Sequence, residues 1–430
     1  MGKLLYLVYY LLITVGSFLA LRLLWSVASG RKLRWRAFAM FIVISGLISA
    51  YYYWETSRRL DVLGEARIDY ARQPGPVIGI AVAWPENQDS FVDGARRAVK
   101  ELNTTSHELN MQDGSKHPYQ IELKEFRYTS KNVGEVARKI AQDDTIAGVI
   151  GHPQLENALQ AAATYNASNL LFLSSGVRSP LLTDYKYPTV FSLTPSDVEI
   201  ADVVKGFANS YDLFNLVALS PRNDYATDTY HIYRGAMNAN GEENRVDAPR
   251  LTQFVSYSPN TIFFADVITD LADNKADLVL LLGTSAADAR IIEQMRRRGV
   301  NTSVICLPEM RDEVLRVMEI TPENTSMDVY VISFETDIYA ESADAAVTEN
   351  NILDGRAYEA VKLMVAAWSQ IGTVEAGPVA LALRALPRWV WGNTTVDFED
   401  NGHIKDVAIR VEKLDLSLPG KSKIVYSGEQ

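Results

Sequence analysis

The chain has 430 residues, 47% of them hydrophobic, and a formal net charge of −11 at pH 7. This length exceeds what one hydrophobic core normally supports, so we expect a large two-lobed unit or two domains beside any membrane segment. Residues 1–54 contain basic residues and no acidic residue, so the rest of the chain is more acidic than the whole. This acidity argues against nucleic acid as a partner and against strong binding of the soluble part to anionic lipid.

The chain lacks the usual signatures of catalysis. Cys306 is the only cysteine, which excludes an internal disulfide and any site that needs two thiolates; in its apolar run we expect a buried strand residue. None of the histidines is spaced with a second metal ligand, and phosphate-binding, dinucleotide-binding and nucleophile-elbow motifs are missing. We therefore expect a protein that is not an enzyme and that needs neither a cofactor nor a metal.

Two apolar runs precede the acidic part. Residues 4–25 form a predominantly apolar run of about 22 residues, or roughly 33 Å of helix, enough to cross a bilayer. Residues 37–54 form a shorter run that ends in Tyr and Trp residues, which suit a membrane interface. The basic loop at 29–36 predicts a cytoplasmic turn. Residues 1–54 are thus predicted to form a transmembrane helical hairpin, with the soluble part outside the cytoplasmic membrane of a bacterium.

Two alternatives to the hairpin remain open. The small residues at 26–28 resemble a signal-peptide cleavage site, although the second apolar run follows at once. A cytoplasmic soluble part would place the basic loop on the wrong side of the membrane. Residues 55–76 are charged and end in Pro and Gly, so we expect a helical stalk or linker before a globular part that begins near Val77.

From Val77 onward, short apolar runs alternate with amphipathic segments. Strands are predicted at 77–82, 119–126, 147–151, 170–174, 216–220, 278–282 and 303–307. Helices are predicted at 90–102, 132–142, 156–165, 199–211, 227–239, 261–274 and 286–298. This alternation indicates an α/β protein with two parallel-sheet lobes, in which a ligand binds beyond the carboxyl ends of the strands.

The order of several short blocks resembles the type I periplasmic binding proteins of the leucine/branched-chain amino-acid receptor group. The blocks are Ile78-Gly79-Ile80 with Asp93-Gly94-Ala95; 147–151; 173–183; Val190-Phe191 with Pro195-Ser196-Asp197; 277–280 with the helix that ends at Gly299; 357–361; and 396–402. The resemblance covers roughly residues 77–410. It implies a bilobal fold with a three-crossover hinge over residues 77–430.

The resemblance also implies discontinuous lobes. Lobe 1 would hold about 77–195 and 308–370, and lobe 2 about 196–307 and 371–415. Ligand binding would then be a hinge closure, in which contacts from both lobes stabilise the closed state.

Ligand contacts are implied for two loops of lobe 1. In the family, serine and threonine hydroxyls and backbone amides hold the ligand carboxylate. This chain departs from that pattern, because His152 stands where serines are usual and Arg178 stands near the usual threonine, after Ser174, Ser175 and Gly176. Arg178 offers a stronger contact for an acidic ligand, or else is a solvated turn residue. His152 is open to the same two interpretations.

Two further candidates follow later in the chain. Tyr225 falls where the family often has an aromatic residue that covers the ligand, and Glu309 where an acid often pairs with an amino group. Glu309 also fits as an acid at a helix N-terminus. Trp389 and Trp391 flank Val390 on one strand face, and we expect them to pack within lobe 2 rather than to form a partner surface.

Two functions follow from these residues. The first is a membrane-anchored periplasmic binding protein that takes a small polar ligand, an amino acid or related carboxylate, for transport or signalling with a membrane permease or sensor. The alternative is an envelope interaction or regulatory protein with a degenerate, non-binding cleft. Arg178, Tyr225 and Glu309 favour the receptor, whereas the missing hydroxyls favour the regulator.

Overall fold

The computed structural model describes residues 46, 63–86, 88–110, 114–222, 226–238, 248–258, 260–283, 286–320, 326–337, 352–418 and 421–428. The chain divides into two compact units, residues 1–67 and residues 68–430. Apart from Gly46, the predicted hairpin lies outside the described residues. Within the described part, no helix is both long and apolar enough to cross a membrane.

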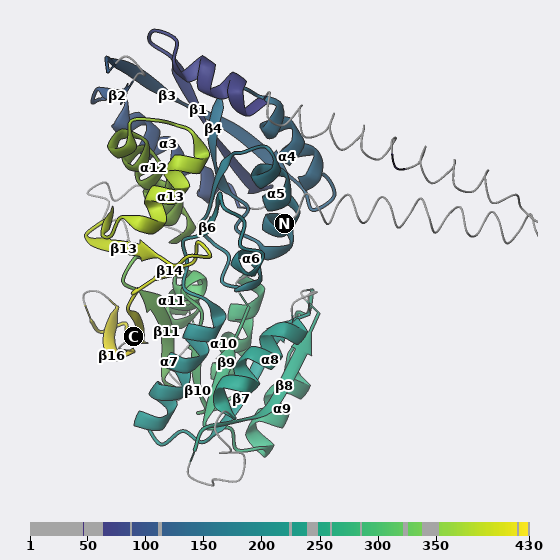
Figure 1. Cartoon of the computed structure of the whole chain (residues 1–430). Coiled ribbons are helices and arrows are strands. Elements are labelled where there is room, and N and C mark those ends of the chain that lie inside the picture. The colour runs from purple at the N-terminus through teal and green to yellow at the C-terminus, as the bar shows by residue number, and fades with distance from the viewer. Residues whose placement is uncertain are drawn as a thin grey trace, which may run out of the picture. The chain divides into compact units, whose positions relative to one another are not determined.

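Lobe 1 is built on a six-stranded sheet in the order β2-β3-β1-β4-β5-β6 (Figure 1). Its strands are β1 (Val77–Pro85), β2 (His107–Asn110), β3 (Lys116–Tyr128), β4 (Ile146–Gly151), β5 (Leu171–Ser174) and β6 (Val190–Ser192). All neighbours are parallel except β2 and β3, so the sheet is mixed. Its first helices are α3 (Ser90–Leu102), α4 (Val133–Gln142), α5 (Leu155–Ala167) and the short α6 (Leu181–Asp184).

Helices cover both faces of this sheet. Successive β1 residues point to opposite sides, so each face presents apolar side chains to the helices on that side. Ile80 and Val82 pack in a core cluster with α3 and with α12 (Ile352–Ile371), a helix from much later in the chain. Ala81 and Ala83 pack instead with α4 and α5. A sheet buried on both faces explains the almost continuous apolar sequence of β1 and β4.

Lobe 2 is built on a seven-stranded sheet in the order β16-β15-β11-β10-β9-β7-β8. Its strands are β7 (Asn215–Pro221), β8 (Arg250–Tyr257), β9 (Leu278–Leu281), β10 (Ser303–Cys306), β11 (Val329–Phe334), β15 (Ile409–Leu414) and β16 (Ser422–Gly428). Its helices are α7 (Asp197–Ser210), α8 (Ala226–Met237), α9 (Ala265–Asp273), α10 (Ala286–Arg297), η2 (Pro308–Met310) and α11 (Arg311–Ile320). The strands from β8 to β11 are parallel, whereas β15 and β16 add antiparallel.

The chain passes between the two sheets three times. It leaves lobe 1 after β6, returns between β11 and α12, and leaves again between β14 (Ile404–Lys405) and β15. The predicted three-crossover topology is therefore present. Before the last crossing, α13 (Ala376–Ala385) and a small sheet of β12 (Trp389–Trp391), β13 (Thr394–Phe398) and β14 pack with α12 and β5.

The last two crossings differ from the predicted lobe boundaries. Residues 308–334 were expected in lobe 1, but β11 pairs with β10 and β15 and so belongs to lobe 2. Residues 371–405 were expected in lobe 2, but they pack on lobe 1. The reason is one further strand: the apolar run of β11 extends the parallel sheet before the chain turns back.

Two other expectations can be compared with the packing. Residues 63–71 are helical as the stalk prediction requires, but Ala71 is buried in the lobe 1 core, so the globular part begins before Val77. Trp389 and Trp391 are buried on one face and Val390 is exposed between them. Their strand contacts α12, so they pack in lobe 1 rather than lobe 2. Cys306 is buried on a strand as expected.

Candidate functional site

The β4 loop begins with a strained backbone. A Cβ atom on Gly151 (φ 144°) would lie 2.1 Å from the carbonyl oxygen of Ala83 on β1. His152 follows with φ 46°, and its backbone N–H donates to the same carbonyl oxygen at 2.9 Å. The close approach of β1 thus requires glycine at 151 and fixes the direction in which the His152 side chain leaves the strand.

The His152 ring lies inside lobe 1. It is fully buried, stacks on Tyr128, meets Phe172 edge-on and pairs through Nε2 with the Tyr165 hydroxyl at 2.9 Å. Burial lowers the pKa of His152 to about 3. The ring is therefore a neutral part of the aromatic core, and it is not exposed to a ligand in this conformation.

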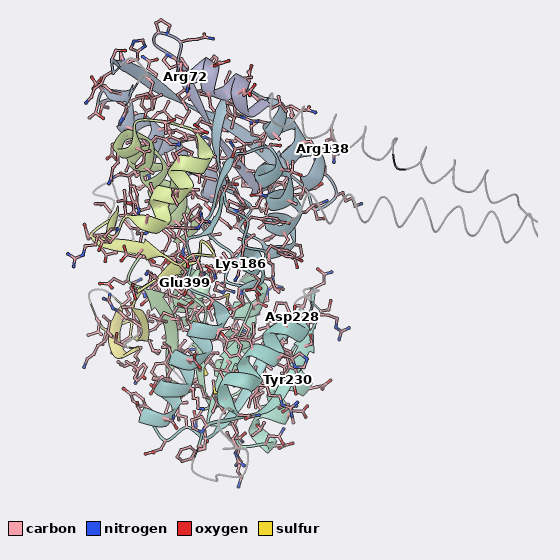
Figure 2. The ribbon with its side chains drawn as sticks, viewed as in Figure 1. Arg72, Arg138, Lys186, Asp228, Tyr230 and Glu399 are labelled. Atoms are coloured by element: carbon pink, nitrogen blue, oxygen red, sulfur yellow. The ribbon has the colours of Figure 1, made fainter. Side chains whose placement is uncertain are left out.

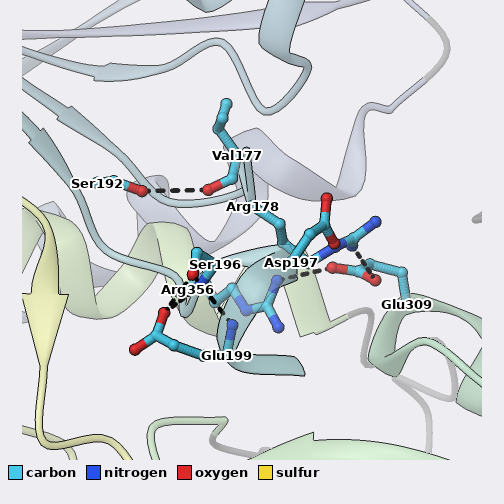
Figure 3. Close-up of polar contacts among 8 residues, drawn as sticks. All are labelled: Val177, Arg178, Ser192, Ser196, Asp197, Glu199, Glu309 and Arg356. Carbon is cyan, nitrogen blue, oxygen red and sulfur yellow. Dashed lines mark hydrogen bonds and ion pairs between the residues drawn. The ribbon is translucent and has the colours of Figure 1, made fainter. Parts of the chain in front are cut away.

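The β5 loop reaches the other lobe. Arg178 donates from Nη1 to Glu309 Oε2 at 2.7 Å and from Nε to Asp197 Oδ1 at 3.2 Å (Figure 3). Its carbonyl oxygen also accepts from the backbone N–H of Asp197 at 2.8 Å. Glu309 stands on η2 after β10, and Asp197 opens α7. The structure thus brings together Arg178 and Glu309, which are 131 residues apart.

A second arginine extends this contact. Arg356 on α12 donates from Nη1 to Glu309 Oε1 at 2.9 Å and from Nε to Asp337 Oδ1 at 2.8 Å. Arg356 and Asp337 are buried, with side-chain exposed fractions of 2% and 0%, and the other three side chains are partly buried, with 14% for Arg178 and for Asp197 and 8% for Glu309. We call these five residues the interlobe ion network.

The charges of the network do not balance, because two arginines meet three carboxylates. Burial alone would raise the pKa of Glu309, but Arg178 and Arg356 outweigh burial and lower it to about 2. For Asp337 the effect of burial prevails over Arg356 and raises the pKa. The network therefore holds Glu309 ionised and, with Asp337 ionised as well, carries one excess negative charge.

Several buried polar atoms that belong to the network, act on it or lie within four residues of its members in the chain have no hydrogen-bond partner among the described residues. They are Ser174 Oγ, Ser175 Oγ, Thr194 Oγ1, Tyr233 OH and Arg356 Nη2. The serines begin the β5 loop, and Thr194 lies in the first crossover. Tyr233, on α8, is close enough to Asp197, Arg178 and Glu309 for their charges to act on its pKa, which burial raises. Buried polar groups without partners are rare in native proteins and require an explanation such as a bound ligand.

The hinge next to this cluster is held by a capping box. The Ser196 hydroxyl accepts from the Glu199 N–H at 3.3 Å, and Glu199 Oε2 accepts from the Ser196 N–H at 2.6 Å. His403 Nε2 lies 2.9 Å from the same carboxylate oxygen. Burial would raise the pKa of Glu199, but hydrogen bonds with His403 and Ser196 lower it to about 2. These contacts connect the first and third crossovers.

Part of the site could not be predicted from the sequence. Asp197 lies in one of the blocks that carry the family resemblance and Arg356 directly precedes another, but neither had a predicted role. Asp337, Thr194 and Tyr233 carried no signal in the sequence. Gly176 lies in the β5 loop, where a Cβ would come within 2.9 Å of Pro153 Cα in the neighbouring β4 loop. Tyr225 lies outside the described residues. Over the parts of the chain that the structure describes, no group of His, Cys, Asp and Glu could hold a metal ion.

A family model described as periplasmic binding protein matches residues 83–415. The chain belongs to the periplasmic binding protein family. Members of this family bind solutes rather than transform them, which confirms the prediction of a non-enzymatic binding protein. A comparison with curated proteins gave no match.

Solved structures confirm the bilobal fold. An ABC transporter substrate-binding protein from Desulfitobacterium hafniense in complex with Leu is 20% identical, with a TM-score of 0.61 over 81% of this chain and 99% of that one. A branched-chain amino acid transporter substrate binding protein from Streptococcus pneumoniae in complex with isoleucine is 15% identical, with a TM-score of 0.64 over 82% and 99%. A solute binding protein from R. palustris in complex with benzoate is 10% identical, with a TM-score of 0.65 over 82% and 96%.

Proposed function

We propose that this chain is a membrane-anchored periplasmic solute-binding protein that holds a small polar solute, an amino acid or related carboxylate, between its lobes. The observation that carries the proposal is the set of unpartnered buried donors at Ser174, Ser175, Thr194 and Tyr233 beside the interlobe ion network. These groups come from both lobes, as a site that responds to hinge closure requires.

The chemistry of the site favours a zwitterion. Hydroxyl groups can donate to a carboxylate, and the excess negative charge of the interlobe ion network can accept an ammonium group. Relatives with the same fold hold leucine, isoleucine and benzoate. An α-amino acid satisfies both halves of this site, whereas benzoate-like acids satisfy only the hydroxyls.

The first test is thermal unfolding of residues 63–430, refolded to remove bound solute, against pairs such as leucine and 4-methylpentanoate. A solute at a hundred times its dissociation constant stabilises the folded state by about 2.7 kcal/mol, which raises the midpoint by at least a few degrees. We expect the amino acid to stabilise more than its deaminated partner. An equal shift for both would remove the ammonium site, and no shift across a broad panel would contradict solute binding.

Ser174 and Ser192 provide a matched pair of variants. They face each other in register on β5 and β6, but only the Ser192 hydroxyl donates, to the Val177 carbonyl at 3.1 Å. Ser174→Ala should remove the solute-induced shift and leave the solute-free midpoint unchanged or slightly higher. Ser192→Ala should lower the free energy of unfolding by about 1 kcal/mol, and with it the midpoint, and should leave solute binding intact. A normal solute-induced shift in Ser174→Ala would exclude that hydroxyl from the site.

The membrane anchor is part of the proposal and rests on the apolar runs at 4–25 and 37–54 with the basic loop between them. The soluble part would then lie outside the cytoplasmic membrane, close to a permease or a sensor. We expect the full-length protein to stay in bacterial membranes washed at alkaline pH. We also expect protease added to spheroplasts to digest residues 63–430. Release at alkaline pH would contradict anchoring.

One observation favours the alternative of a regulatory protein with a non-binding cleft. Both carboxylate oxygens of Glu309 and two nitrogens of Arg178 already bind protein groups rather than waiting for a ligand. The thermal unfolding panel separates the two functions, because a regulator with a filled cleft would not respond to any solute.

A further inference from the structure

The interlobe ion network is sorted by lobe. Both arginines belong to lobe 1: Arg178 follows β5, and Arg356 lies on α12, which packs against α3. The three carboxylates belong to lobe 2, where Asp197 opens α7, Glu309 follows β10 and Asp337 follows β11. Every ion pair of the network therefore joins one lobe to the other. Figure 3 draws the network without Asp337.

The carboxylate of Glu309 connects the network. It receives Arg178 on one oxygen and Arg356 on the other, so separating either arginine leaves a buried charge that is only half neutralised. Asp337 is fixed in turn, because its second oxygen accepts from the Phe334 N–H at 3.1 Å. The Arg356 guanidinium also stacks over the Phe334 ring at 5.1 Å. Breaking one ion pair of such a buried network is costly, because the remaining partner is left with a buried charge that is not fully neutralised.

We propose that the interlobe ion network is a lock that holds the two lobes together when no solute is bound. The pairs of Glu309 with Arg178 and Arg356 join parts of the two lobes that lie outside the crossovers, so these pairs exist only while the lobes touch. A solute that enters from water must first open the lock, and the lobes then close again around it. The lock operates without a ligand, so it does not depend on the proposed function.

Lobe 2 offers a matched control inside a single lobe. Arg311 Nη1 and Glu412 Oε2 are 2.7 Å apart, the same distance as Arg178 and Glu309, with side-chain exposed fractions of 11% and 12%. Ser333 and Ser422 donate to the same Glu412 carboxylate at 2.6 and 2.7 Å. Breaking this pair disturbs a charge about as buried as that of the Arg178–Glu309 pair, but both partners belong to lobe 2 and no interlobe ion pair is lost.

The test is the distance between two spin labels in the full-length, solute-free protein in detergent. The labels replace Arg138, exposed on α4 of lobe 1, and Asp228, exposed on α8 of lobe 2 (Figure 2). The buried Cys306 should not react in the folded protein. With the network intact we expect one narrow distance distribution, unchanged by moderate salt because the pairs are buried.

Glu309→Gln should broaden the distribution and shift its mean by more than about 2 Å, since charge is lost at the centre of the lock. Glu412→Gln should leave the distribution as in the unmodified protein. If Glu309→Gln does not fold, Arg178→Gln at the more exposed edge of the network carries the same expectation. An unchanged distribution in the folded lock variant, or an equal change in Glu412→Gln, would overturn the lock. Because no solute is present, neither result bears on whether the cleft binds one.

Discussion

The loops after β4 and β5 hold the same topological position in lobe 1 but send their polar side chains in opposite directions. His152 turns inward and completes an aromatic cluster, whereas Arg178 crosses to lobe 2 and joins two carboxylates. The β4 loop is held by its own lobe, so substitutions there should change the stability of the fold. The β5 loop is held by the other lobe, so substitutions there should change lobe closure and solute binding.

Topology therefore locates a site but does not decide which residues face it. His152 is held by Tyr128 and Tyr165, whose rings come from β3 and α5 of the same lobe. Arg178 has no such cluster and finds its partners 19 and 131 residues along the chain. The contrast between the β4 and β5 loops can be tested by three substitutions.

The largest effect should come from Gly151→Val in the β4 loop. The new side chain would meet the Ala83 backbone at 2.1 Å and would hold a φ of 144° that β-branched residues avoid. We expect a loss of more than about 3 kcal/mol in the free energy of unfolding, measured by urea denaturation. Gly377→Ala is the control, because its Cβ meets nothing within 4 Å on α13. A mild effect at 151 would show that the β4 loop is not rigid.

A medium effect should appear as a pH dependence carried by His152. Its folded pKa of about 3 lies below the ordinary 6.5, so the unfolded state binds the proton first and stability is lost as pH falls below 6.5. Between pH 7.5 and 5 the unmodified protein should lose about 2 kcal/mol more than His152→Phe, which keeps a ring but cannot titrate. Equal losses in both proteins would place the titrating group elsewhere.

The smallest effect should come from Arg178→Lys in the β5 loop. Lysine keeps the charge but cannot hold Asp197 and Glu309 together as the guanidinium fork does. We expect the free energy of unfolding, measured by urea denaturation, to fall by about 1 kcal/mol. The loss should be the same at pH 7.5 and pH 5, since Glu309, with its pKa lowered to about 2, stays ionised at both. A loss that grows toward pH 5 would mean that the network itself titrates.

Much of the lobe architecture was predictable because hydrophobic periodicity reports local structure. The helix at 90–102 has the predicted bounds, and β4, β9 and β10 differ from prediction by one residue at an end. The lobe boundaries were not predictable in the same way. Assigning β11 requires knowing that it pairs with β10, and a single apolar run does not specify its neighbours.

The site was predictable only as single residues. Arg178 and Glu309 were singled out, but the sequence could not show that they pair with each other or that Arg356 and Asp337 complete the chain of charges. Likewise, the sequence pattern of a histidine after a strand is the same whether its ring faces a ligand or the core. Tertiary packing around Tyr128 and Phe172 decides that question.

A small solute bound between the lobes should be visible in a crystal structure of the protein with the solute that stabilises it most. The account predicts solute density in contact with Ser174, Thr194 and Tyr233, with a positively charged group beside the network carboxylates. Density at another place, or an unchanged interlobe ion network with no density beside it under saturating solute, would contradict the account.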